Sequence, residues 1–244
     1  GIQGKRNSPT VFYASLHAMQ FWDGRAKDVE EQAGGPILNP VEHNLASEAD
    51  VVARIENEEL YIDWFRRAFP EEDKPINFAN LTKAIGAFER TLNPVSRCGR
   101  YLDGGKKALN KQEKKGLSSF MSSGCTTCHN GVALGGQIFQ KFGLYTDYWT
   151  LTKSKEIDNG LADLTNKDSD KHFFKVPSLR NIENTAPYFH DGSVALLEEA
   201  IKHMGKAQTN IDLTDEQVGD IQAFLSSLTA DIPKAVQKSP FEDE

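Results

Sequence analysis

Two cysteines and a histidine stand within five residues, in the order Cys125-Thr126-Thr127-Cys128-His129. One short helical turn presents both sulfurs on one side and places the imidazole that follows beside them. This C-x-x-C-H pattern is the attachment motif of c-type haem. The thiols bond to the porphyrin vinyl groups, and the imidazole reaches the iron as the proximal ligand. The spacing therefore predicts one covalently bound haem c.

Two other chemistries also use paired cysteines. A thioredoxin-like redox pair needs a strand–helix–strand context, which the surrounding pattern lacks. A zinc site needs further Cys or His residues at paired spacing, and Cys98 is the one other cysteine of the three in the chain. We interpret Cys98 as an incidental thiol, which could form an intermolecular disulfide if it were exposed. Three cysteines in 244 residues also exclude a disulfide-stapled scaffold.

The iron of an electron-transfer haem takes a second axial ligand, often a methionine thioether. The candidate ligands are Met19, Met121, Met204, His190 and His203. Met121 lies too close to Cys125 to reach the opposite face of the haem, whereas Met204 ends a predicted helix well downstream. Met204 also continues an apolar helical stripe, where a methionine is usually part of the core. We expect Met204 to be the sixth ligand.

Composition limits the partners. The 28 Lys+Arg against 35 Asp+Glu give a net charge of −7 and a pI near 5.5, which argues against nucleic acid and favours a basic protein partner. The mean hydropathy is −0.51, and no apolar run approaches the ~18 residues that a membrane helix needs. The chain opens at Gly1 without a start Met or an apolar leader, so we expect a processed or trimmed product.

Helical periodicity dominates the elements that must position the haem motif. Helices are predicted over 47–68 with Ser47 as N-cap, over 77–94, around Leu117, Phe120 and Met121 on one face, over 197–204 ended by Gly205, and after the capping box Thr214–Gln217. Residues 95–107 predict a linker and 241–244 a mobile acidic tail. Residues 131–187 show no sustained period, and we expect this long loop to wrap the cofactor.

Several segments resemble the bacterial di-haem cytochrome c peroxidases, relatives of the enzyme that matures tryptophan tryptophylquinone. They follow the family's order from about residue 5 to 205, and their combination is specific. The matching stretches are Lys5–Thr10 (KRNSPT), Gln20–Ala26 (QFWDGRA), Glu30–Pro36 (EEQAGGP) with Asn39–Glu42 (NPVE), Cys125–His129, Phe174–Asn181 (FKVPSLRN), and Thr185–Ser193 (TAPYFHDGS) with Leu197–Gly205 (LEEAIKHMG).

The resemblance implies how electrons enter. In that family a high-potential haem takes electrons from a small donor cytochrome c or copper protein, and a second haem reduces hydrogen peroxide to water. The residues that align with the attachment sites and axial ligands of the high-potential haem are Cys125, Cys128, His129 and Met204. Trp22 aligns with the tryptophan between the two haems and would be an electron conduit. From the residues alone, a core aromatic is the favoured interpretation of Trp22.

The resemblance also implies a peroxide site and a calcium site. Gln32 and Glu42 align with the polar pair over the peroxidatic haem, where Glu42 would move a proton between the peroxide oxygens and Gln32 would donate to the developing charge. Without the resemblance, Glu42 is a surface acid and Gln32 an ordinary helix residue. The residues that align with the ligands of an inter-domain calcium are Asn7, Thr185 and Pro187.

One departure from the family is large, because its members carry two C-x-x-C-H motifs and this chain carries one. We expect the other attachment segment to lie upstream of Lys5 in the intact protein. A haem closed on both faces by His129 and Met204 offers peroxide no coordination position. The 244-residue chain alone is therefore predicted to accept electrons from a donor with negligible peroxidase turnover.

The prediction is an all-α fold of two haem-type domains with long loops and little strand. Residues 1–94, with the tail 232–244, would form a peroxidatic-type domain lacking its haem motif, and residues 95–231 the electron-transfer cytochrome c domain. The predicted function is that of a cytochrome c peroxidase. The alternatives are a mono-haem electron-transfer cytochrome without catalysis and a related di-haem oxidase. Covalent haem attachment predicts a periplasmic protein, and we expect a homodimer.

Overall fold

The computed structural model describes residues 2–239, which form many helices and one two-stranded sheet. The helices are α1 (Val29–Leu38), α2 (Glu48–Ile55), α3 (Glu59–Ala68), α4 (Phe78–Glu89), α5 (Arg97–Leu102), α6 (Lys111–Ser122), α7 (Tyr148–Thr152), α8 (Ala162–Thr165), α9 (Leu197–Met204) and α10 (Asp215–Ser226). Strands β1 (Phe139–Lys141) and β2 (Phe173–Lys175) pair antiparallel. The expectation of a helix-rich chain with little strand is confirmed.

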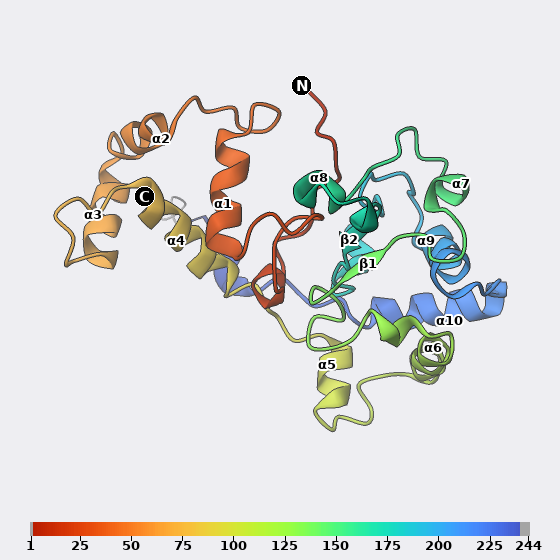
Figure 1. Cartoon of the computed structure of the whole chain (residues 1–244). Coiled ribbons are helices and arrows are strands. Elements are labelled where there is room, and N and C mark those ends of the chain that lie inside the picture. The colour runs from red at the N-terminus through yellow and green to blue at the C-terminus, as the bar shows by residue number, and fades with distance from the viewer. Residues whose placement is uncertain (1, 240–244) are drawn as a thin grey trace.

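Helices α1–α4 gather on one side of the molecule (Figure 1). Each of three begins where a side chain accepts a backbone N–H at the third helical position: Asp28 for α1, Ser47 for α2 and Asn77 for α4. Val29 and Ala33 are buried on α1, which packs along α4. The sequence left open one or two helices within residues 47–68, and the structure has two there; the helix predicted over 77–94 ends at Glu89.

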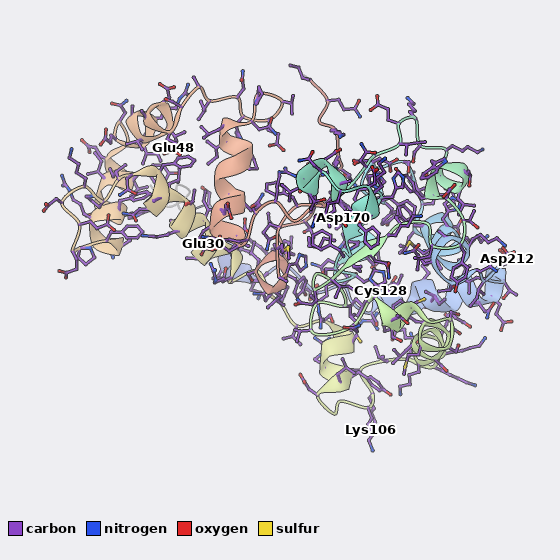
Figure 2. The ribbon with its side chains drawn as sticks, in the orientation of Figure 1. Glu30, Glu48, Lys106, Cys128, Asp170 and Asp212 are labelled. Atoms are coloured by element: carbon purple, nitrogen blue, oxygen red, sulfur yellow. The ribbon has the colours of Figure 1, made fainter. Side chains whose placement is uncertain are left out.

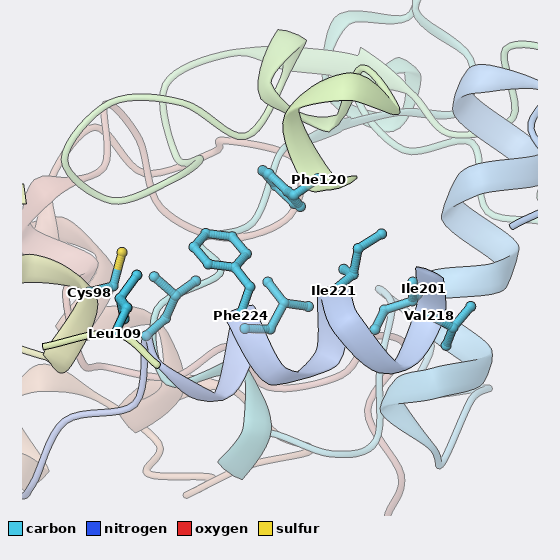
Figure 3. Packing of buried hydrophobic residues seen from close by; sticks show 9 residues of the cluster. Cys98, Leu109, Phe120, Ile201, Val218, Ile221 and Phe224 are labelled. Carbon is cyan, nitrogen blue, oxygen red and sulfur yellow. The ribbon is translucent and has the colours of Figure 1, made fainter. Parts of the chain in front are cut away.

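The opposite side of the molecule is organised by α10 packed across α6 (Figure 3). Phe120 of α6 meets Phe224 of α10 with ring centroids 5.3 Å apart, and Ile221 is buried beside them. The helices approach so closely at Gly116 that a Cβ there would lie 1.8 Å from the Asp220 carbonyl oxygen, which only glycine permits. The predicted capping box at Thr214 is present with both of its hydrogen bonds.

Three expectations about this half are corrected. Residues 97–102 form helix α5 instead of a linker, capped by Ser96, because Cys98 packs into the core with 3% exposure. Cys98 is therefore not an exposed thiol. Met121 is 57% exposed and points away from the buried face that carries Phe120. Gly205 does not end the helix before it, since its backbone stays helical and the chain continues as a π-helix over Gly205–Thr209.

The N-terminal segment before α1 lies against the second half of the chain. Asn7 N donates to His190 O at 2.6 Å, Lys175 N to Trp22 O at 2.8 Å, and Ala18 N to Gly136 O at 2.9 Å. Residues after α10 run back toward the side that holds α1–α4 (Figure 1). The predicted mobile tail 241–244 lies outside the described residues. No helix within residues 2–239 is both long and apolar enough to cross a bilayer.

Candidate functional site

The C-x-x-C-H motif folds as the single turn that haem attachment requires. Residues Cys125–Thr127 form one 3₁₀ turn, entered through Gly124 at φ 80°. His129 N donates to Cys125 O at 3.0 Å, which closes the turn. Cys125 and Cys128 are half-buried free thiols, and burial raises the pKa of Cys125 to about 11. Cys128 lies beside β1, where Gln140 Nε2 is 3.8 Å from its Sγ (Figure 2).

His129 has the surroundings of a metal-binding imidazole. It is 8% exposed, and burial lowers its pKa to about 4, although the carbonyls of Leu134 and Pro177 act in the opposite direction. The ring is therefore neutral at pH 7. Its Nδ1 lies 3.2 Å from Leu134 O, and with the proton on Nδ1 this contact orients the ring and leaves Nε2 to bind iron. The motif's residues thus fit a haem.

Met204 is the last residue of α9, directly before the π-helix. It packs half-buried against an aromatic cluster, defined by the buried residues Phe142, Tyr148, Phe174 and Ala207. The π-helix returns to the haem motif, because a Cβ on Gly124 would lie 3.6 Å from Thr209 Cγ2. π-Helical turns are frequent at functional sites. The segment that follows Met204 therefore contacts the turn that carries the haem motif.

His190, a rival ligand, lies in the same aromatic cluster. It is 1% exposed, its ring stacks on Phe174 at 4.1 Å, and Tyr148 meets it edge-on at 5.0 Å. Burial lowers the pKa of His190, and its Nε2 has no hydrogen-bond partner. An orphaned buried nitrogen fits a polar group of a bound cofactor. The other rival, His203, lies next to Met204 on α9, about 100° around the helix.

Trp22 joins the aromatic cluster to the N-terminal segment. Its ring packs half-buried against the cluster, 6.3 Å from the His190 ring in an edge-on contact. Trp22 Nε1 donates to Asn7 O at 2.9 Å. Trp22, the predicted electron conduit, is therefore hydrogen-bonded to Asn7, one of the predicted calcium ligands.

The predicted calcium ligands Asn7 and Pro187 meet, although 180 positions separate them. Asn7 Nδ2 lies 2.7 Å from Pro187 O and 3.3 Å from Phe189 O. A flip of the Asn7 amide would present Oδ1 beside the Pro187 carbonyl, and calcium favours such oxygen donors. Thr185 lies two positions before Pro187, with its hydroxyl donating to Ile182 O at 3.1 Å.

Gln32 and Glu42, the predicted peroxide-handling pair, are not joined to each other in the structure. Gln32 is half-buried on α1 and lines a cavity of about 40 Å³. Glu42 lies exposed in the turn after α1, where its N–H donates to Asn39 O at 3.0 Å. Among the described residues, no hydrogen bond joins Glu42 to Gln32.

A buried ion cluster beside Trp22 was missed by sequence reasoning. Arg6 donates to Asp23 at 2.6 Å and to Asp158 at 2.7 Å. Burial raises the pKa of Asp158, but Arg6 outweighs this effect and the value falls to about 2. Arg6 could have been noticed, because it stands directly before Asn7 in one of the stretches that resemble the family. Asp158, 152 positions away, lies in no such stretch.

Comparison of the sequence with known proteins identifies the family of this chain. A family model described as di-haem cytochrome c peroxidase matches residues 1–107. The chain is 46% identical to cytochrome c551 peroxidase of Pseudomonas aeruginosa over 235 residues, covering 95% of this chain and 67% of that protein. It is 44% identical to cytochrome c551 peroxidase of Nitrosomonas europaea over 233 residues, with the same coverages. The chain belongs to the di-haem cytochrome c peroxidase family.

The fold agrees with this membership. A solved structure of a MauG-like protein associated with microbial copper homeostasis superposes with a TM-score of 0.83 at 32% identity, covering 98% of this chain and 79% of that one. The family resemblance seen in the sequence is thus confirmed, and the chain is a peroxidase oxidoreductase. Membership of a di-haem family implies haem c as its cofactor. It spans 67% of the length of the two cytochrome c551 peroxidases.

Proposed function

We propose that this protein reduces hydrogen peroxide to water with electrons from a small c-type cytochrome or copper protein, which enter through a haem attached to Cys125 and Cys128. The observation that carries the proposal is the motif turn with His129 buried, neutral and oriented by the Leu134 carbonyl, in a chain of the peroxidase family. When bound, haem supplies reversible one-electron transfer.

The chain's own residues set the properties of that haem. Neutral His129 and the Met204 thioether would both bind the haem iron, a ligand pair that favours a high potential. The aromatic cluster beside Met204 excludes water from this side. A closed, dry site of this kind suits electron transfer and does not suit binding of peroxide. Catalysis then belongs elsewhere in the protein.

Trp22 would connect electron entry to the catalytic side. Its ring is fixed by the aromatic cluster and by its hydrogen bond to Asn7 O. Calcium held by Asn7, Thr185 and Pro187 would fasten the N-terminal segment to the loop before α9. The ion would therefore hold Trp22 in position.

Peroxide reduction would take place beside α1. The reaction H₂O₂ + 2e⁻ + 2H⁺ → 2H₂O needs a proton placed on the leaving oxygen, and Glu42 would transfer it. Gln32 would donate a hydrogen bond to the oxygen that gains charge. Because the family is di-haem and this chain has one C-x-x-C-H motif, we propose that turnover needs a second haem, attached outside these 244 residues. We further propose a periplasmic homodimer.

The assay is peroxide-dependent oxidation of reduced donor cytochrome by the protein carrying both haems. Glu42→Ala should lower turnover by ~10²-fold, as expected for a lost acid–base group, while reduction of the protein by donor keeps its rate. The matched control is Glu71→Ala, which removes an equally exposed turn carboxylate and should change neither rate. Turnover of the Glu42 variant within twofold of the parent would remove Glu42 from the mechanism.

A further inference from the structure

The cavity beside Gln32 is walled by polar groups from four parts of the chain. It measures about 40 Å³, more than the ~10–15 Å³ that one water molecule needs. Gln32 comes from α1, Glu89 from α4 and Lys175 from β2. The N-terminal segment contributes His17 and Gln20.

Glu89 is a buried carboxyl group without a neutralising partner. It is 5% exposed, and its Oε2 has no hydrogen-bond partner. The neighbouring Arg90 is engaged by Glu30 of α1 in a two-bond ion pair. Burial, followed by the negative charge of Glu30, raises the pKa of Glu89, and the charge of Arg90 opposes the rise.

Glu113, another buried glutamate of this protein, has the hydrogen-bond partners that Glu89 lacks. Glu113 is 4% exposed, yet its carboxylate accepts hydrogen bonds from Arg97 at 2.5 Å and from Asn110 N at 2.8 Å. A structural carboxylate is normally satisfied in this way. Glu89 instead leaves one buried oxygen unpaired, and the residue lines a cavity that can hold water.

A buried basic pair also lines the cavity. Lys175 is 6% exposed and donates to His17 Nδ1 at 3.0 Å, and His17 Nε2 has no partner. Burial lowers the pKa of Lys175 to about 8 and, together with the charge of Lys175, that of His17 to about 3. Within residues 2–239, no ion pair of 4 Å or less joins Glu89 to Lys175. The same cavity is thus lined by a buried acid and a buried base that form no ion pair with each other.

We propose that Glu89 is a proton-supplying residue of the peroxidase, which holds a proton inside the protein and passes it through cavity water toward Gln32. The inference rests on the proposed function, because each peroxide consumes two protons together with two electrons from the donor. Glu89 loses one proton as a carboxylic acid, becomes a carboxylate and takes a proton back from solvent by way of the cavity. Glu42 completes the transfer to the leaving oxygen.

The first test detects the proton itself. Infrared spectra of the haem-loaded protein, recorded as the pH is lowered from neutral, should show the C=O stretch of a buried carboxylic acid, shifted in D₂O, at a higher pH than the exposed carboxyl groups become protonated. Glu89→Gln should remove this band, and Glu113→Gln should retain it. A band that survives Glu89→Gln, or that is absent from the parent protein, overturns the inference.

The second test uses the pH dependence of peroxide turnover in the protein carrying both haems. Turnover should fall as the pH rises through the pKa of Glu89. Glu89→Gln should lower the maximum turnover rate ~10²-fold and abolish its fall at high pH, which is the alkaline limb of the pH profile. Glu89→Asp should restore part of the rate and this alkaline limb. Glu30→Gln removes a negative charge that raises the pKa of Glu89, so the limb should move to lower pH.

These outcomes separate the inference from the function on which it rests. A folded Glu89→Gln protein with parental turnover and an unchanged pH profile overturns the role of Glu89 and leaves the peroxidase intact. A parent protein that carries both haems and does not turn over peroxide overturns the function itself. Thermal unfolding of each variant shows that it is folded, and Glu89→Asp keeps the test open if Glu89→Gln does not fold.

Discussion

Replacing Arg6 with alanine should destabilise the protein more than any exposed charge deletion. Arg6 is the cation between Asp23 and Asp158, and the three side chains are 12%, 10% and 7% exposed. Removing it leaves two buried carboxylates without their partner, which typically costs about 3–5 kcal/mol. The pKa of Asp158 falls from 3.8 to about 2, to which Arg6, the Gly160 N–H and the charge of His190 contribute, and this whole shift corresponds to about 2.5 kcal/mol for that carboxylate.

The same interaction predicts how stability depends on pH. Because the pKa of Asp158 is depressed on folding, its contribution is complete above the unfolded value of 3.8 and is lost as the pH falls toward about 2. The free energy of unfolding should therefore fall between about pH 4 and 2 in the parent protein, and less steeply in Arg6→Ala.

Urea unfolding at a series of pH values, followed by circular dichroism, measures both quantities. Lys5→Ala is the control, since Lys5 is 62% exposed in its pair with Asp163 and should contribute less than ~1 kcal/mol. If Arg6→Ala matched Lys5→Ala in stability, or kept the parental slope in acid, the cluster around Arg6 would not have the assigned role.

Two further predictions concern the ligands. Met204→His should lower the haem potential and abolish the sulfur-to-iron near-infrared band, whereas Met121→Leu, at a 57% exposed position, should leave both unchanged; an unchanged band in Met204→His would assign the ligand elsewhere. Chelation of calcium should lower the thermal unfolding temperature and slow inter-haem transfer, and Asn7→Ala should remove this sensitivity. If chelation alters neither unfolding nor haem spectra, Asn7 and Pro187 do not hold an ion.

Local signals predicted local structure well. The caps at Ser47 and Thr214 are side-chain-to-backbone bonds within three residues, so the sequence pattern contains them entirely. Helix α5 was missed because its Gly and charged residues resemble a linker. Its position depends on Cys98 N donating to Ser227 O at 3.0 Å, a tertiary contact that no local pattern reports.

The candidate site also has a part that a local motif predicts and a part that depends on contacts between distant segments. The turn Cys125–His129 could be predicted because one motif contains both thiols and the imidazole. Asn7 and Pro187 could be paired only through the family resemblance, since 180 positions separate them. Glu89 gave no signal, because its burial beside Gln32 depends on the packing of α4 against α1.

Haem attachment is the most direct test of the whole account. The protein is produced in a host that matures c-type cytochromes, extracted with acid–acetone, and examined by intact mass and by haem staining after denaturation. We predict that the 244-residue chain retains one haem and that a variant with both Cys125→Ser and Cys128→Ser retains none. Complete extraction of haem from the parent chain, or covalent haem on the double variant, would contradict the assignment of the electron-entry site.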